Sequence, residues 1–200
     1  MSTPRDLLIT ASEPAVGRSV EQGDLSLALA GAEAVDLIAA GAVTLADDRL
    51  VPGERSPLAD PLLDRAAAAL NRQAPYETVT DWLWRRGRDL TPAYLAALEA
   101  DGELEEKRRR RWVVLRTTSI VPTDTPARRR AAERWAAAEP VLAGLGTAVG
   151  LRDGAPPAAD PGTAAVLAAV DDAVGELAAE RRRRARRRED AHAENVRRGY

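Results

Sequence analysis

The sequence lacks cysteine altogether and contains a single histidine, His192. The absence of cysteine excludes disulfide bonds, thiol catalysis and cysteine-ligated metal sites. His192 stands in a strongly charged segment, where we expect a solvated imidazole rather than a catalytic one. Phenylalanine is also absent and there is one methionine, so a hydrophobic core must be built mainly from leucine, valine and alanine.

The motifs of the common enzyme classes are missing as well. There is no Walker loop, no glycine-rich dinucleotide motif, no nucleophile elbow and no HExxH zinc motif. Glu33 and Asp36 lie three residues apart, so in a helix they would share a face. They could form a buried acid pair. The favoured interpretation is that they are polar anchors at the domain surface or partners of arginine side chains. We therefore expect no enzyme activity and no cofactor.

No stretch of the chain is long and apolar enough to span a bilayer. The most apolar stretch, residues 25–40, is shorter than the about 20 residues that spanning requires, and it contains two acids. Its apolar residues surround most of a helical wheel, which predicts a buried central helix. Asp24 is expected to cap the first turn, and Gly41 to end the helix in the left-handed conformation. Residues 1–18 are broken by prolines and an acid, so we expect no signal peptide and a cytoplasmic protein, able to associate with the inner face of the cell membrane.

Strong helix formers, namely alanine, leucine, arginine and glutamate, dominate the rest of the chain. The predicted fold is mainly α: a single globular helical domain around the buried central helix, with two small β-hairpins. Residues 1–179 are assigned to this domain, and residues 180–200 to a charged tail that is helical or disordered. Asp60, followed by Pro61, is the expected cap of one helix. Helices are predicted at residues 4–12, 60–72, 77–86, 92–101 and 127–150, the last with a break near Pro140, and hairpins at residues 43–51 and 103–117. Residues 163–198 are predicted to form one long helix or two.

Charge is distributed unevenly, although the net charge is only −2. Residues 1–100 contain nine arginines and fifteen acids, whereas residues 101–200 contain twenty cations and sixteen acids. Clustered basic residues favour an anionic partner, either nucleic acid or a lipid surface. The clusters lie at residues 107–111, 128–130, 181–184 and 186–188.

The second hairpin is the best local candidate for such a contact. Its strands are predicted at Leu104–Lys107 and Trp112–Arg116, with the basic run Lys107–Arg111 at the turn. An anionic bilayer attracts each nearby Lys or Arg by about 1 kcal/mol, and tryptophan favours the headgroup boundary. The hairpin tip could therefore sit on a membrane, and a solvated basic turn with Trp112 in the core explains the same residues equally well.

A resemblance to a known family rests on four stretches that occur in order and span most of residues 5–130: DLLITASEPAVGR, LALAGAEAVDLIAAGAVTL, ETVTDWL and LAALEADGELEEKRRRRWVVLRTTSIVP. They are similar to segments of the GPP34 family, the Golgi phosphoprotein 3-like proteins. The corresponding family segments are an opening DLLLLxLDDxxGR, a GLAGALLxELALxGRI helix, a helix with a tryptophan, and LxxxLVxxGVL followed by a hairpin. The sequence resembles an actinobacterial form of this family.

The resemblance implies a mostly helical peripheral membrane protein. Eukaryotic members bind phosphatidylinositol 4-phosphate in a basic pocket, insert a hydrophobic hairpin into the bilayer and gather cargo enzymes for vesicle sorting. The implied partners are thus an anionic phospholipid membrane surface and a protein cargo. The family's pocket positions correspond here to Glu21 or Gln22, Ala30, Arg88 and Thr91, so that only Arg88 keeps a pocket cation. The residues expected to bind lipid are Arg85, Arg86, Arg88, Arg108, Arg109, Arg110, Arg111 and Trp112.

Two other interpretations of the basic residues remain open. A helix followed by Gly102 and a basic hairpin also resembles a winged helix, and arginine clusters neutralise nucleic-acid phosphates. Nucleic acid is the less favoured partner, because the helix at 92–101 offers alanine and acids rather than cations to a groove. The third interpretation is a soluble helical scaffold whose basic tail, from Arg181 to Arg198, binds an acidic protein.

Overall fold

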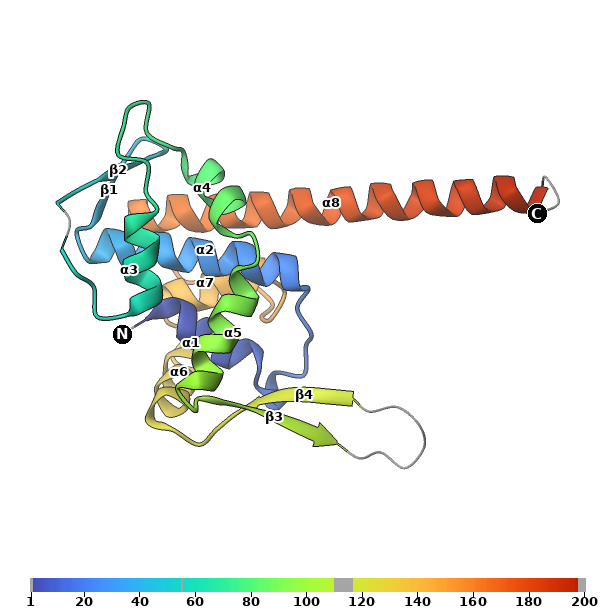
Figure 1. The fold of residues 1–200 in the computed structure, drawn as a ribbon, viewed down its shortest axis with the longest axis horizontal. Coiled ribbons are helices and arrows are strands. Elements are labelled where there is room, and N and C mark those ends of the chain that lie inside the picture. The colour runs from blue at the N-terminus through green and yellow to red at the C-terminus, as the bar shows by residue number, and fades with distance from the viewer. Residues whose placement is uncertain (1, 55, 110–116, 198–200) are drawn as a thin grey trace.

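Helices account for most of the structure, as the composition predicts, and two antiparallel hairpins complete it (Figure 1). The computed structural model describes residues 2–54, 56–109 and 117–197. In chain order the elements are α1 (Thr3–Ala11), the 3-10 turn η1 (Pro14–Val16), α2 (Gln22–Ala39), β1 (Val43–Ala46), β2 (Arg49–Pro52), α3 (Pro61–Ala68), α4 (Val79–Arg86), α5 (Leu90–Ala100), β3 (Leu104–Arg109), β4 (Thr117–Pro122), α6 (Pro126–Ala136), α7 (Pro140–Ala148) and α8 (Pro161–Arg197).

α2 is the central helix and is buried along most of its length. α1, α4, α5, α7 and α8 all pack against it, so apolar side chains around the whole helix find partners. Gly41 adopts φ +68° beyond its end, which confirms the expected left-handed stop. The predicted start is wrong: α2 begins at Gln22, and Asp24 pairs with Arg181 of α8 instead of capping. An acid in the first turn of a helix still interacts favourably with the helix dipole.

α2 and α8 approach each other closely in the core. Gly31 of α2 lies against Val170 of α8, and a Cβ added to Gly31 would come within 2.3 Å of a Val170 methyl carbon. Contacts this short are not found between real side chains, so the two helices can pack at this distance only around a glycine.

Local signals fix the ends of α3 and α5. Asp60 caps α3 as predicted, because its carboxylate accepts hydrogen bonds from the first-turn amides at 2.9 and 3.4 Å. α3 ends at Ala68, earlier than the predicted residue 72, and Arg85 of α4 binds the carbonyl of Ala69 just beyond that end. α5 begins at Leu90, before the predicted residue 92. Asp89 takes a left-handed conformation (φ +54°) that turns the chain directly from α4 into α5.

Both predicted hairpins are present, and the second needs a correction. β1 and β2 pair antiparallel over the predicted residues. β3 pairs with β4 from Leu104 opposite Pro122 to Arg109 opposite Thr117. The hairpin therefore extends to Pro122, beyond its predicted end at residue 117, because the threonine, isoleucine and valine residues of β4 favour a strand. The predicted strand Trp112–Arg116 lies outside the described residues. Residues 110–116, which include the predicted tip, lie outside the described residues.

The last helix is continuous and leaves the body of the molecule. α6 and α7 are separated close to Pro140, as predicted. α8 then runs without interruption across the domain boundary predicted at residue 180. Residues 182–197 of α8, here called the α8 extension, project beyond the other helices (Figure 1). The side chains of residues 182–194 are exposed.

Candidate functional site

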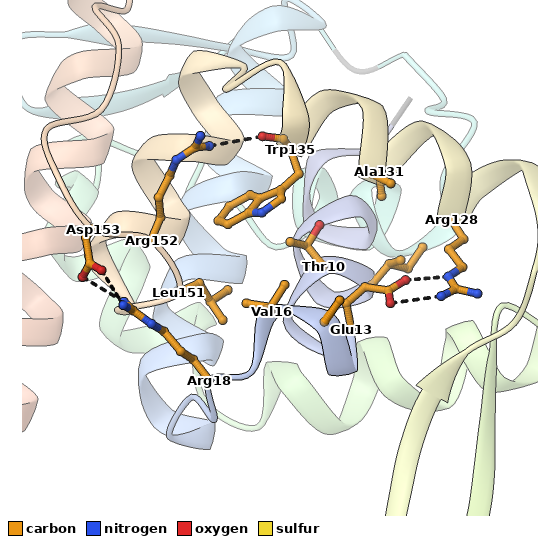
Figure 2. A pocket seen from close by; sticks show the side chains of 13 residues that line it. Thr10, Glu13, Val16, Arg18, Arg128, Ala131, Trp135, Leu151, Arg152 and Asp153 are labelled. Carbon is orange, nitrogen blue, oxygen red and sulfur yellow. Dashed lines mark hydrogen bonds and ion pairs between the residues drawn. The ribbon is translucent and has the colours of Figure 1, made fainter.

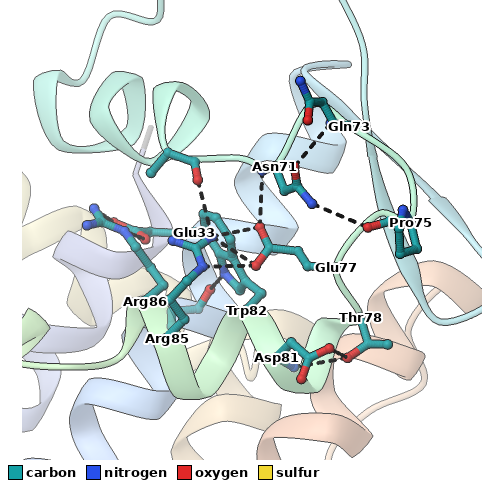
Figure 3. Close-up of polar contacts among 12 residues, drawn as sticks. Glu33, Asn71, Gln73, Pro75, Glu77, Thr78, Asp81, Trp82, Arg85 and Arg86 are labelled. Atoms are coloured by element: carbon teal, nitrogen blue, oxygen red, sulfur yellow. Dashed lines mark hydrogen bonds and ion pairs between the residues drawn. The ribbon is translucent and has the colours of Figure 1, made fainter.

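One of the two predicted arginines of α4, Arg86, faces a buried acid of α2 (Figure 3). Arg86 forms a two-point ion pair with Glu33, in which its Nε and Nη2 atoms each lie 2.8 Å from a carboxylate oxygen. The side chain of Glu33 is 0% exposed and that of Arg86 is 20% exposed. The hydroxyl of Tyr94 lies 3.0 Å from the same carboxylate and donates to it. Arg86 thus belongs to a polar network in the core and is not a free surface cation.

Burial controls the titration of this network. Burial raises the pKa of Glu33 above its ordinary value, although the Arg86 guanidinium and the Tyr94 hydroxyl favour the ionised carboxylate and oppose the rise. Burial and the neighbouring Glu33 charge also raise the pKa of Tyr94, which keeps its hydroxyl a donor. Asp36 has a different partner: it accepts a hydrogen bond of 2.7 Å from the amide of Thr3. The two acids are therefore separate anchors, as the favoured interpretation predicts.

Arg85 is held by a second network on the outer side of α4 (Figure 3). Its guanidinium binds the carboxylate of Glu77, with distances of 2.6 and 2.9 Å from Nη2. It also lies over the ring of Trp82, 5.3 Å from the ring centroid, where a cation and an aromatic face attract each other. The Trp82 indole in turn donates to the carbonyl of Ala30 at 2.9 Å. Arg85 is partly exposed, but an acid already neutralises its charge.

Arg88 is the predicted arginine of this region that is available to a ligand. Its side chain is exposed, and it has no hydrogen bond or ion pair within the described part of the chain. The backbone behind it is fixed: a Cβ on Gly87 would lie 2.6 Å from a carbonyl oxygen of the preceding turn. The amide of Thr91 donates to the hydroxyl oxygen of Ser26 at 3.1 Å. Among the family's pocket positions, Ala30 and Thr91 are buried, and Arg88 presents a cation to solvent.

The other predicted lipid-binding residues belong to the hairpin. Arg108 and Arg109 end β3, whereas Arg110, Arg111 and Trp112 lie outside the described residues. The cations of β3 stand opposite neutral residues of β4, which have hydroxyl side chains. The pairs are Lys107 with Ser119, Arg108 with Thr118, and Arg109 with Thr117. The register therefore places no acid directly opposite these three positions.

The base of the hairpin is fixed to the body. Leu104, the first residue of β3, is buried in the core. The amide of Thr123 donates to the carbonyl of Glu103 at 2.9 Å, and the hydroxyl of Thr125 binds the Glu103 carboxylate. These contacts set the direction in which the basic outer half of the hairpin leaves the body.

The hairpin and the α8 extension project from the same end of the molecule, the end at which α2 begins (Figure 1). Two contacts attach α8 to the start of α2. Arg181 forms an ion pair with Asp24, and a Cβ on Gly23 would lie 3.0 Å from a methyl carbon of Leu177. Basic segments far apart in the sequence thus leave one end of the body together.

The α8 extension carries the larger share of the cations at this end. Residues 181–188 contain seven arginines and no acid. Glu180 pairs with Arg183 and Arg184, each at 2.7 Å. Within the described residues the following arginines make no ion pair: Arg182, Arg186, Arg187 and Arg188.

The sequence did not reveal which acid pairs with which arginine. It therefore did not show which arginines are neutralised and which are available to a ligand. Arg86 and Glu33 are 53 residues apart, and Arg181 and Asp24 are 157 residues apart. Neither spacing falls within the three or four residues over which pairing on one helix is predictable. The one available signal was that an acid in an apolar helix needs a cationic partner, but it does not say which cation.

Exposed arginines of α8 give this end of the molecule a cluster of positive charge. Among the described residues, no group of three or more histidine, cysteine or acidic side chains could hold a metal ion. No helix within the described ranges has the length and apolar character needed to cross a membrane.

Comparison with known protein families identifies the family of the chain. The family model described as Golgi phosphoprotein 3 (GPP34) matches residues 4–199, which is nearly the whole chain. No curated protein matches the chain.

Proposed function

Because the chain belongs to the Golgi phosphoprotein 3 (GPP34) family, we propose that it is a peripheral membrane protein that binds anionic phospholipid. The resemblance of its sequence to that family makes phosphatidylinositol 4-phosphate the first lipid to test. The proposed contact is the end of the molecule from which the basic hairpin and the α8 extension project. No catalytic step is part of the proposal.

The observation that carries the proposal is the charge of the hairpin's outer half. Lys107, Arg108 and Arg109 stand opposite serine and threonine in β4, and the basic run continues to Arg111 in the sequence. Each cation near an anionic membrane contributes about 1 kcal/mol to binding. A hairpin with a fixed base and several cations in its sequence therefore supports attraction to a membrane surface without any deep pocket.

The structure gives the predicted pocket arginines unequal roles in the proposal. Arg86 and Arg85 are already bound to Glu33 and Glu77, so recruiting either to a phosphate would break an existing ion pair. Arg88 has no such cost. We therefore assign Arg88 to the lipid contact, as a contributor weaker than the hairpin run.

Co-sedimentation with vesicles tests the proposal. The protein is mixed with neutral vesicles, vesicles containing phosphatidylserine, and vesicles containing phosphatidylinositol 4-phosphate at the same net charge. We expect binding to both anionic preparations and not to the neutral one. Absence of binding to any anionic vesicle at low salt would refute the proposal, and a preference at matched charge would reveal headgroup recognition.

Variants locate the contact. Arg108→Glu with Arg110→Glu should weaken vesicle binding by at least about 2 kcal/mol, which is roughly 30-fold, because two favourable charges are lost. Arg88→Ala should have a smaller effect. A chain shortened after Arg181 serves as the comparison for the α8 extension, since it keeps the Asp24 ion pair. An effect of Arg88→Ala as large as that of the hairpin variant would place the main contact at the turn between α4 and α5 instead.

Nucleic acid is a less suitable ligand for this surface. The exposed residues of α5 are proline, alanine and glutamate, and none is a cation that could contact phosphate in a groove. A gel-shift salt series run beside the vesicle assay separates the two ligands. Tight duplex binding without vesicle binding would favour the winged-helix interpretation.

A further inference from the structure

A cavity of about 640 Å³ lies between the α1–α2 connection, α6 and the segment after α7 (Figure 2). None of the residues predicted to bind lipid lines it. Its volume falls within the range of about 300–1,000 Å³ that is typical of small-molecule sites. The apolar part of its lining includes Ile9, Val16, Ala131, Trp135 and Leu151.

Two ion pairs stand at the sides of the cavity (Figure 2). Arg18 binds Asp153 through both terminal nitrogens, one of them at 2.9 Å, and the Arg18 charge lowers the pKa of Asp153. Arg128 binds Glu13 through Nε and Nη2, the latter at 3.1 Å. Each acid of the lining is thus matched by one arginine.

Arg152 is the remaining arginine of the lining and has no acid as partner within the described residues. Its guanidinium lies over the ring of Trp135, 5.1 Å from the centroid, and donates to the Trp135 carbonyl at 3.2 Å. A guanidinium has five donor hydrogens, so donors remain for a ligand. The lining as a whole carries one uncompensated positive charge.

The aromatic wall of the cavity is fixed in place. Trp135 packs against Gly146 of α7, where an added Cβ would lie 2.5 Å from the nearest ring atom. The ring therefore has no room to move toward α7, and Arg152 stays stacked on a rigid surface. A cation held in place beside an apolar wall is preorganised, so less conformational freedom is lost when a ligand binds.

We propose that this cavity binds a small amphipathic monoanion, in which a carboxylate attached to an apolar chain is recognised by Arg152. Arginine binds carboxylates through two parallel hydrogen bonds, which suits an anionic head group. The apolar chain would cover the aliphatic and aromatic lining between α1 and α6. The ligand is a free fatty acid or a membrane lipid that presents the same chemistry.

Calorimetric titration with dodecanoate below its micelle concentration tests the proposal. We expect saturable binding with one site per chain, and much weaker binding of the uncharged analogue dodecanol. Arg152→Met should weaken dodecanoate binding roughly tenfold or more, because it removes a charge-assisted contact and keeps the aliphatic stem. Arg65→Met, at an exposed arginine of α3 that does not line the cavity, is the matched control and should leave this affinity unchanged.

A second variant blocks the cavity without disturbing the core. Ala132 is exposed and lines the cavity, so Ala132→Trp should fill the opening and abolish binding while thermal unfolding stays unchanged. The proposal would be overturned if dodecanoate did not bind, if dodecanol bound equally well, or if both variants kept the affinity of the parent protein.

Vesicle binding by Ala132→Trp identifies the source of the ligand. Reduced co-sedimentation of that variant points to a membrane lipid, and unchanged co-sedimentation points to a soluble acid. Dodecanoate binding is measured without any membrane, so its failure is distinguishable from a failure of the proposed function.

Discussion

At the scale of single residues, the ion pair between Arg86 and Glu33 holds a charged carboxylate in the core. Glu33 is completely buried, and its carboxylate depends on Arg86 and Tyr94 for compensation. Removing one partner of a buried pair leaves a charge that neither water nor protein satisfies.

Arg86→Met should therefore lower the free energy of unfolding by about 3–5 kcal/mol near neutral pH. Urea denaturation followed by circular dichroism measures this loss. Arg88→Met, two positions along in the sequence and exposed, is the control and should stay within about 0.5 kcal/mol of the parent. Similar values for both variants would show that Glu33 is compensated in another way.

The same variant has a defined pH dependence. The folded-state pKa of Glu33 is raised, so its contribution to stability is complete below the unfolded-state pKa and is lost as the pH rises through the folded-state pKa. Arg86→Met removes the contact that opposes this rise and should raise the pKa further. The stability difference between parent and variant should then be smaller at about pH 4 than at about pH 8, because a protonated Glu33 tolerates the loss of its partner. A difference that is independent of pH would contradict this account.

The close packing at Gly31 leads to a second prediction, about the effect of one added methyl group on stability. Gly31→Ala would place a methyl group 2.3 Å from the Val170 side chain and should lower the free energy of unfolding by about 1–3 kcal/mol. Val170→Ala makes room for that methyl group, so a double-mutant cycle should show a favourable coupling between the two substitutions. Simple additivity would mean that the helices separate instead.

At the scale of elements, α8 divides into a packed part and an exposed part. Leu177 and Arg181 contact the start of α2, whereas the described side chains after Arg181 are exposed. Exposed side chains away from packing contribute little to stability.

Deleting residues 182–200 should therefore change the free energy of unfolding by less than about 0.5 kcal/mol. Deleting residues 177–200 also removes Leu177 and the Asp24 ion pair and should cost about 1–2 kcal/mol more. Thermal and urea unfolding of the two shortened chains provide the comparison. A large loss on removing only 182–200 would reveal contacts that the exposure of these residues does not suggest.

Elements with strong local signals were predictable from the sequence. The apolar surface of α2, the Asp60 cap of α3 and the left-handed Gly41 each depend on residues adjacent in the chain. The basic hairpin was predicted to end at residue 117 but extends to Pro122, because strand pairing depends on register with a partner, and register has no strong local signature here. The site was predictable as a set of cations, but the partners that neutralise Arg85 and Arg86 are tertiary contacts.

At the scale of the whole molecule, the proposed membrane contact depends on charges that stand at the surface. Raising the salt concentration from about 0.1 M to about 1 M shortens the Debye length from about 10 Å to about 3 Å. Vesicle binding should therefore fall steeply over this range, as measured by co-sedimentation. Binding that persists in high salt would indicate insertion of apolar residues as the main contribution.

The charge pattern of α8 has a consequence for how the molecule would be oriented on a membrane. Seven arginines occupy residues 181–188, whereas residues 189–200 carry three acids and two arginines. The carboxyl end of a helix is itself partly negative. An anionic surface would attract the half of the α8 extension that is nearer to the body, and it would not attract the far half. This difference in attraction would exert a torque on the helix. Bound molecules would thus share one tilt, with the far end of α8 raised from the surface.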